Sequence, residues 1–299
     1  MSAIEHLQVE ANGVLFHVAV SGPEGAPSLL CLHGFPEGWM SWRKIMGMLD
    51  GVRVYAPDQR GYPGTSGGGD RYDVLTLTDD VKALIEVLGL DRPVLAAHDW
   101  GAELAWVFAH RYSNLISHLI VVNGTHPKTL VRAVLRCQDL QTFRLPWIYF
   151  FELPRFPEYL MTTAVGRRLL RWAFLLREGK SGAMDRALVD ELVARFQEPA
   201  DARGPIGYYR ALAATVLSRQ GRRDLQDVYS TPIATPVTAV WGLKDGALPI
   251  KVAMASGDDA GCDVEWRPLP GIGHFVPLEA PGRLAAEIAR VVAGGGRSG

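Results

Sequence analysis

One aspartate, Asp99, is the residue of this sequence best placed to do chemistry. It lies in a turn, Ala97–Gly101, between the short apolar run Val94–Ala97 and a segment of small and helix-forming residues. This pattern predicts a buried strand, a sharp turn and a helix, with small residues where the two backbones approach each other. Such a turn would lift the Asp99 side chain above the end of the strand. We therefore interpret Asp99 as a candidate nucleophile, and the plain alternative is a helix-capping aspartate.

The chemistry open to Asp99 follows from its charge. A carboxyl group with the ordinary pKa of about 3.9 is ionised at neutral pH, so it can attack an electrophilic carbon without help from a base. The product is an ester between the enzyme and its substrate. Because hydrolysis of that ester then becomes the difficult step, a base is needed to activate water.

Two residues further along the chain are candidates for activating that water. Asp245 follows the predicted strand Val237–Gly242, and His274 follows the last predicted strand and two glycines. In such loops an acid can orient an imidazole and stabilise its cation. Asn123 ends the preceding strand and competes with Asp245 for this role, but an amide cannot supply a negative charge.

Strand and helix patterns alternate along most of the chain. The predicted strands are 7–13, 14–21, 28–32, 52–56, 94–97, 115–122, 237–242 and 264–266, and the predicted helices are 39–49, 75–88, one after Asp99, and 281–292. This alternation predicts a mostly parallel sheet with helices on both faces. Ligands of such sheets bind beyond the carboxyl ends of the strands, where the unusual turns after Leu32, Ala56 and Ala97 should converge.

The alternation stops in the middle of the chain. Residues 126–227 are rich in arginine, leucine and aromatic residues, with helical spacing in 165–177 and 184–196. This segment is either a helical extension that stabilises the sheet or a lid over the site. We favour a lid, because the reaction needs water excluded and the segment leaves the sheet at a strand end. The expected domains are a core, 1–125 and 228–299, and a helical lid, 126–227.

Length and composition exclude several classes of protein. The chain has 299 residues, of which 48% are hydrophobic and 21% charged, as is typical of a globular protein with a large core. The net charge of −1 argues against nucleic acid or an anionic membrane as a partner. The start lacks a secretory signal, no apolar run could span a bilayer, and the three cysteines are scattered. We expect a cytoplasmic protein without metal, nucleotide or flavin cofactors.

Five motifs lie at or near the predicted strand ends. They are His33–Glu37, Asp58–Tyr62, His98–Gly101, Trp241–Asp245 and Gly273–Glu279. Together they resemble the epoxide hydrolase branch of the α/β-hydrolase superfamily, whose close relatives are the haloalkane and haloacid dehalogenases. The nucleophile, acid and histidine also follow the chain order of that superfamily. The resemblance implies an α/β-hydrolase fold: a mostly parallel, eight-stranded sheet with helices on both faces and an inserted helical lid.

The resemblance also implies a role for each matching residue. Asp99 would attack the carbon, and the backbone N–H groups of Phe35 and Trp100 would form an oxyanion hole. Each donor of such a hole is typically worth about 3 kcal/mol. His274 would deprotonate the hydrolytic water, and Asp245 would orient His274.

The leaving oxygen of an epoxide needs a proton donor, which lid tyrosines supply in the resembled family. The segment Gly204–Arg210 is similar to the second lid motif and makes Tyr209 the candidate. The first lid motif departs from the pattern, because an ungapped match places Trp147 in the substrate pocket at the usual tyrosine position. Tyr149, two residues later, is the only hydroxyl nearby. Either Tyr149 completes the pair, or Tyr209 acts alone or with Trp147.

Several functions remain to be weighed. The leading hypothesis is a hydrolase acting on ether bonds, which converts small apolar epoxides and water to vicinal diols. The alternative is a haloalkane dehalogenase, with the indoles of Trp100 and Trp147 binding halide, but the Tyr209–Arg210 pair favours epoxides. The complete set of three candidate catalytic residues argues against a mere binding protein, and the missing serine argues against an ester hydrolase. The natural substrate, enantioselectivity and oligomeric state, including a homodimer, stay open.

Overall fold

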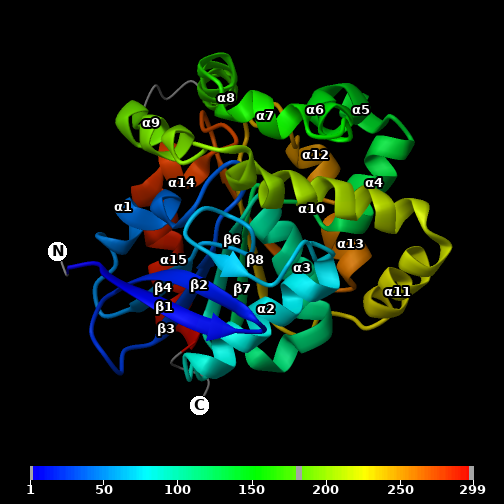
Figure 1. The fold of residues 1–299 in the computed structure, drawn as a ribbon. Helices are drawn as coiled ribbons and strands as arrows, with labels where there is room; N and C mark the ends of the chain where they lie inside the picture. Colours follow the sequence, from blue (N-terminus) through cyan, green and yellow to red (C-terminus); the bar gives the residue numbers. More distant parts are fainter. Residues whose placement is uncertain (1–2, 180–183, 296–299) are drawn as a thin grey trace.

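The structure is a computed structural model that describes residues 3–179 and 184–295, and a twisted sheet forms its centre (Figure 1). The strands are β1 (Glu5–Ala11), β2 (Val14–Ser21), β3 (Ser28–Leu32), β4 (Arg53–Pro57), β5 (Ser66–Gly67), β6 (Val94–His98), β7 (His118–Val122), β8 (Val237–Gly242) and β9 (Val264–Leu269). Eight of them follow the order β1-β2-β4-β3-β6-β7-β8-β9, and the two-residue β5 pairs with β2. The strands from β4 to β9 along this order pair in parallel, whereas β2 pairs antiparallel with β1, β4 and β5.

The local sequence explains these strands. Asn12 and Gly13 both have positive φ, 47° and 71°, as the tight turn of the β1–β2 hairpin requires. The five residues of β6 are all buried, which fits a central parallel strand covered on both faces. Leu95 and Ala97 of β6 face one hydrophobic cluster, and Val94 and Ala96 face another.

Helices cover both faces of the sheet. The helices of the core are α1 (Arg43–Met46), α2 (Val74–Val87), α3 (Trp100–Tyr112), α12 (Ile250–Ala253), α13 (Ser256–Ala260), α14 (Val276–Glu279) and α15 (Pro281–Gly295). Buried leucines, valines and isoleucines of α2 and α3 pack in one cluster with the sheet, and those of α1 and α15 pack in the other. The predicted layered sheet is therefore confirmed.

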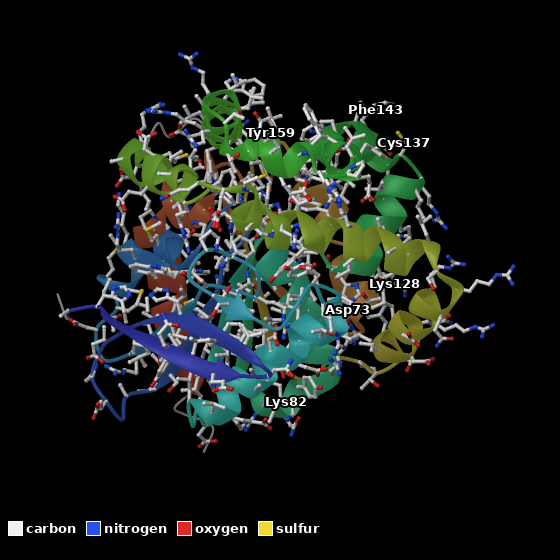
Figure 2. The ribbon with its side chains drawn as sticks, viewed as in Figure 1. Asp73, Lys82, Lys128, Cys137, Phe143 and Tyr159 are labelled. Carbon is white, nitrogen blue, oxygen red and sulfur yellow. The ribbon has the colours of Figure 1, made fainter. Side chains whose placement is uncertain are left out.

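A run of helices separates β7 from β8 along the chain. These are α4 (Pro127–Leu135), α5 (Gln141–Arg144), α6 (Pro146–Phe151), α7 (Phe156–Thr162), α8 (Ala164–Leu176), α9 (Arg186–Ala194), α10 (Pro199–Leu217) and α11 (Arg219–Tyr229). We call them the inserted helical region. In Figure 1, α5 to α8 form a layer above the sheet, and Figure 2 shows Phe143 and Tyr159 on the outer side of that layer, where they are 73% and 61% exposed. The predicted helical insertion is thus present.

Three details differ from the sequence-based expectations. The expected helix 39–49 is only a 3-10 turn followed by the four-residue α1, because the poor helix former Gly47 ends it. The expected strand 115–122 begins at His118, since Ser113–Leu115 forms a 3-10 turn. The expected domain boundary at residue 227 lies inside α11, and the division into two domains stays a prediction. Residues 1–2, 180–183 and 296–299 of the expected domains lie outside the described ranges.

Among residues 3–179 and 184–295, no helix is both long enough and apolar enough to cross a membrane.

Candidate active site

The turn between β6 and α3 places Asp99 above the sheet. Asp99 has φ 49° and ψ −119°, a backbone conformation that costs a non-glycine residue about 1–3 kcal/mol. The turn needs glycine nearby, because a Cβ on Gly101 would lie 2.6 Å from the Leu32 carbonyl oxygen. A Cβ on Gly34 would lie 2.5 Å from the Asp99 Cβ. Gly34 and Gly101 therefore let the loop after β3, the end of β6 and the start of α3 meet around one carboxylate.

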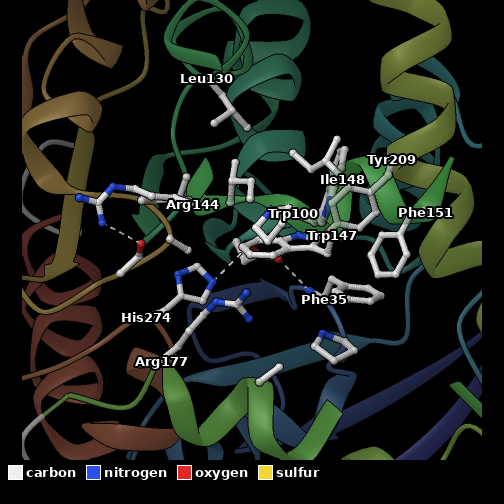
Figure 3. A pocket seen from close by; sticks show the side chains of 18 of the residues that line it. Phe35, Trp100, Leu130, Arg144, Trp147, Ile148, Phe151, Arg177, Tyr209 and His274 are labelled. Atoms are coloured by element: carbon white, nitrogen blue, oxygen red, sulfur yellow. Dashed lines mark hydrogen bonds and ion pairs between the residues drawn. The ribbon is translucent and has the colours of Figure 1, made fainter. Parts of the chain in front are cut away.

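The Asp99 carboxylate faces two other loops rather than its own helix. Asp99 holds the N-cap position of α3, yet its side chain makes no capping hydrogen bond, so the helix-capping alternative is wrong. The Phe35 N–H donates to Oδ1 at 2.8 Å, and His274 Nε2 lies 3.3 Å from Oδ2 (Figure 3). Burial raises the pKa of Asp99, but the hydrogen bond and charge of His274 outweigh burial and bring the pKa down to about 2. The carboxylate is therefore ionised.

His274 is held between two carboxylates. Its Nδ1 lies 2.7 Å from Asp245 Oδ2, opposite the Nε2 that faces Asp99. Burial lowers the pKa of His274, but the charge and hydrogen bond of Asp245, with those of Asp99, raise it to about 10. The imidazole is thus protonated in the resting site at neutral pH.

Asp245 is fixed by a full set of donors. The N–H groups of Ala247 and Leu248 donate to Oδ1 at 2.7 and 2.9 Å, and Asn123 Nδ2 donates to Oδ2 at 2.6 Å. Burial raises the pKa of Asp245, and the charge of His274 brings it below its usual value. Asn123, the rival for the acid position, therefore supports Asp245 instead of replacing it.

Asp99, His274 and Asp245 form a triad, and the sequence-predicted residues Trp100 and Tyr209 approach it from α3 and α10. Trp100 is the first residue of α3, so its backbone N–H has no acceptor within the helix. Tyr209 of α10 packs edge-to-face on Trp100 and Phe35, with ring centroids 4.9 and 5.3 Å apart. Burial and the charge of Asp99 raise the pKa of Tyr209 well above its usual value, although the indoles of Trp100 and Trp147 oppose this. The hydroxyl of Tyr209 therefore stays protonated.

These residues line a pocket of about 620 Å³ between the core and the inserted helical region. Its wall is mostly apolar and includes Trp147, Ile148 and Phe151 of α6 (Figure 3). Tyr149 is not part of this wall and is 54% exposed. Two residues along a helix rotate the side chain by about 200°, so Trp147 and Tyr149 face opposite sides of α6. The alternative in which Tyr149 completes a pair of donors is wrong for this geometry, and Trp147 holds the pocket position.

Two features of the site escaped the sequence-based analysis. Glu37 Oε2 accepts from the Gly34 N–H at 2.7 Å and lies 2.9 Å from His98 Nδ1, while His98 Nε2 lies 3.0 Å from the His274 carbonyl oxygen. This series of hydrogen bonds connects the loop that carries Phe35, the candidate oxyanion donor, with the loop that carries His274. Both residues belong to motifs quoted above, but their pairing across 61 positions has no local signal. The second feature is Arg177, which lines the pocket beside Trp147.

The arrangement can perform nucleophilic chemistry without a metal. An ionised carboxylate, a histidine with its own acid, an unused helix N–H and a protonated phenol surround one apolar pocket. Such a set can form an ester and then hydrolyse it. In the described part of the chain, no cluster of three or more histidine, cysteine or acidic side chains could hold a metal ion.

Known proteins share this architecture. Residues 27–281 match the family described as alpha/beta hydrolase fold. The chain is 31% identical to Epoxide hydrolase 4 of Mus musculus over 255 residues, which cover 83% of this chain and 68% of that protein. The structure of epoxide hydrolase VrEH1 from Vigna radiata is 28% identical, with a TM-score of 0.80 and coverage of 97% and 98% of the two chains. The structure of Cfl2 from Burkholderia cenocepacia has a TM-score of 0.84 at 26% identity, covering 96% of this chain and 95% of that one.

Proposed function

The chain belongs to the epoxide hydrolase branch of the α/β-hydrolase fold family, and from that premise we propose that it hydrolyses epoxides with an apolar body to vicinal diols. One observation carries the proposal: the ionised Asp99 carboxylate lies in the turn between β6 and α3, 3.3 Å from His274, which Asp245 holds. The name of the mouse relative and the apolar pocket wall support an epoxide as the electrophile.

In the first step, Asp99 attacks a ring carbon and the carbon–oxygen bond of the epoxide breaks. The electron pair stays on the oxygen, which takes the proton of the Tyr209 hydroxyl. Trp147 also lines the pocket, and its indole N–H is the second donor that we assign to this oxygen. The phenolate then recovers its proton from the His274 imidazolium, which leaves the histidine neutral.

Ester formation itself prepares His274 for the second step. The pKa of about 10 depends on both Asp245 and Asp99, and the ester no longer carries the charge of Asp99. The neutral imidazole takes a proton from water, and the resulting hydroxide attacks the ester carbonyl. The backbone N–H groups of Phe35 and Trp100 stabilise the oxyanion. Collapse of the tetrahedral state releases the diol, which takes a proton from His274. The carboxylic acid formed at Asp99 then protonates His274 again. This restores the Asp99 carboxylate and the His274 imidazolium of the resting site.

Product analysis tests the reaction class. Purified protein is offered styrene oxide and, separately, 1-bromohexane, with Asp99→Ala as the control. We expect diol from the epoxide, no bromide release, and neither product from the control. Absence of diol with the wild-type protein would overturn the proposal.

A haloalkane dehalogenase is the second candidate, because the indoles of Trp100 and Trp147 both line the pocket. Tyr209→Phe separates the two reactions. It removes the proton donor of epoxide opening, whereas two indole N–H groups suffice for a halide. Bromide release that survives Tyr209→Phe, without diol formation by the wild type, would favour the dehalogenase.

A further inference from the structure

Arg177 is a charged pocket residue to which the proposed reaction gives no role. It follows α8 as its C-cap residue, and its side chain reaches toward His274 and Trp147 (Figure 3). Its guanidinium carbon lies 4.0 Å from the centre of the Trp147 ring. Throughout residues 3–179 and 184–295, no carboxylate pairs with this guanidinium and no side chain accepts a hydrogen bond from it.

Another arginine of the same pocket shows the contrast. Arg144 donates to the carbonyl oxygens of Asp139 and Gly246 at 3.0 and 3.1 Å, and it pairs with the Asp139 carboxylate at 3.5 Å. Its hydrogen-bonding capacity is therefore used within the protein. Arg177 has the same five donors, and its side chain lines the pocket.

The position of Arg177 is fixed by its backbone. The carbonyl oxygen of Arg177 accepts from the His274 N–H at 3.1 Å, and two residues later the Gly179 N–H donates to Glu279 at 2.8 Å. A Cβ on Gly273 would lie 2.1 Å from the Arg177 carbonyl oxygen, so the two loops are in direct backbone contact. The arginine is thus held beside the candidate base, not on a freely moving surface segment.

Stacking on Trp147 leaves the donors of Arg177 available. A cation–π contact uses the flat face of the guanidinium, whereas its N–H groups point outward along the edge. Burying a cation without a contacting anion is unfavourable, and burial lowers the pKa of Arg177. The charges of Asp99 and Asp245 act on it through space only. The edge of the guanidinium is therefore available to donate hydrogen bonds to an anion.

We propose that Arg177 binds a carboxylate of the substrate, so that the pocket takes epoxides in which an acid group accompanies the apolar body. A carboxylate accepts two parallel N–H donors from one guanidinium, a geometry that lysine cannot match. The apolar part then lies against the aromatic and aliphatic wall of the pocket. This inference rests on the proposed function, because it names the substrate class of that reaction.

The charges of the resting site are compatible with such a substrate. Asp99 and Asp245 are balanced by the protonated His274 and by Arg177. Glu103 also lines the pocket, and burial together with the charge of Asp99 raises the pKa of its carboxyl well above the usual value, which favours its uncharged form. An incoming carboxylate therefore meets two cations that offset the two carboxylates of the site. Without Arg177, the same carboxylate would enter a site that already carries a net negative charge.

The competing explanation is that Arg177 only supports Trp147 or balances the triad. If Arg177 only supports Trp147, its removal will affect charged and neutral ligands alike. If it only balances the triad, Arg177→Lys, which keeps the charge, will retain the whole preference for an acid. A test must therefore compare an acid with its uncharged amide in the same protein.

Calorimetric titration of the full-length protein at neutral pH provides that comparison without turnover. The ligands are phenylacetate and 3-phenylpropanoate, each against its amide, and the variants are Arg177→Met and Arg177→Lys. Arg168→Met is the matched control, because Arg168 lies on α8 but is exposed and outside the pocket. We expect the wild type to bind at least one acid about 10- to 100-fold more tightly than its amide, the range for a charge-assisted hydrogen bond. Arg177→Met should abolish that preference, Arg177→Lys should retain part of it, and Arg168→Met should keep it whole.

Two results would overturn the inference. One is a wild type that binds neither acid better than its amide, which needs no variant to fold. The other is an Arg177→Met protein that keeps the preference of the wild type. Because binding is measured on the resting protein, failure here is separate from failure of the proposed function, which the diol assay with styrene oxide reports.

Turnover extends the comparison to a reacting substrate. The wild type is expected to use 3-phenylglycidate with a higher kcat/KM than the neutral 3-phenylglycidamide. In Arg177→Met the ratio of these two values should fall by about 10- to 100-fold. An unchanged ratio would contradict the assignment of the carboxylate to Arg177.

Discussion

At the scale of single residues, the position of His274 between two carboxylates gives one imidazole two successive states. The resting imidazole is protonated, with a pKa of about 10, because Asp245 and Asp99 both stabilise its cation. Once Asp99 is an ester, Asp245 is the one of these two carboxylates that still carries a charge. The proposed reaction therefore makes the base available only after the ester has formed.

Asp99→Asn mimics the charge of that ester and tests this coupling. We expect the pKa of His274 to fall well below about 10 in this variant, because one of its two stabilising charges is gone. Titration of the imidazole by nuclear magnetic resonance measures it directly. Asp245→Asn is the matched variant and should lower the pKa more, since Asp245 contributes more to the shift. A titration that is unchanged in Asp99→Asn would contradict the coupling.

The same charges predict how stability depends on pH. His274 has a folded-state pKa of about 10 against 6.5, so its contribution is complete below pH 6.5 and is lost as the pH rises through 10. Asp99 has a pKa of about 2 against 3.8, so its contribution is complete above pH 3.8 and is lost as the pH falls through 2. The free energy of unfolding of the wild type minus that of His274→Gln should therefore shrink between pH 6.5 and 10. A difference that stays constant over that interval would argue against a protonated resting His274.

Asn123 is expected to act through Asp245. Asn123→Ala removes the 2.6 Å hydrogen bond to the buried carboxylate and the bond that the Gly242 N–H donates to Asn123. Hydrogen bonds to charged groups contribute about 1.5–3 kcal/mol, so we expect ester hydrolysis to slow by at least about tenfold. Single-turnover kinetics should show a smaller effect on ester formation, which does not use Asp245. Equal slowing of both steps would indicate a general loss of structure instead.

At the scale of elements, the β6–α3 turn depends on glycine more than on any local propensity. Gly101→Ala would place a Cβ 2.6 Å from the Leu32 carbonyl oxygen, and that backbone belongs to the sheet and cannot yield cheaply. We expect a loss of roughly 1–3 kcal/mol in the free energy of unfolding, measured with urea. Gly246→Ala is the control, because its Cβ would meet nothing within 4 Å. Equal stability of the two variants would show that the β6–α3 turn accommodates a Cβ at residue 101 without strain.

The elements that the sequence predicts well are those whose pattern is local. Buried parallel strands are continuous apolar runs, and the β1–β2 turn carries its Asn12-Gly13 signal. The face that a short helix turns to the pocket is not local information. In α6, Trp147 and Tyr149 are both aromatic, and only the packing of the inserted helical region decides that Trp147 faces inward. The sequence therefore left this choice open.

At the scale of the whole molecule, ion pairs tie the inserted helical region to the core. Arg195 lies 2.8 Å from Asp58, whose side chain is 1% exposed, and Arg43 lies 2.8 Å from the exposed Glu191. Removing one partner of a buried pair leaves an uncompensated charge, whereas an exposed pair contributes little. The two pairs should therefore differ in their effect on stability.

Arg195→Ala is expected to destabilise the protein by about 3 kcal/mol, because the buried Asp58 then loses the guanidinium that pairs with its carboxylate at 2.8 Å. Arg43→Ala, which also breaks a contact between the core and the inserted helical region, should change stability by only about 0.5 kcal/mol. Chemical denaturation of both variants provides the comparison. An Arg195→Ala protein as stable as Arg43→Ala would mean that the buried pair contributes nothing.

The part of the site that follows the ends of the parallel strands could be predicted from the sequence. Asp99, Asp245 and His274 follow three strands, and the carboxyl ends of those strands meet at one edge. The pairing of Glu37 with His98 and the place of Arg177 in the pocket were not predictable. Each depends on contacts between segments far apart in the chain, and an arginine after an amphipathic helix is indistinguishable in sequence from a solvated one.

The central claim is that Asp99 forms a covalent ester that His274 helps to hydrolyse. Intact-protein mass spectrometry of His274→Ala, mixed with styrene oxide, tests it most directly. The account predicts that the protein gains the mass of one substrate molecule, that peptide mapping locates the gain on Asp99, and that diol is not released. A His274→Ala protein that stays unmodified while it still produces diol would contradict the account.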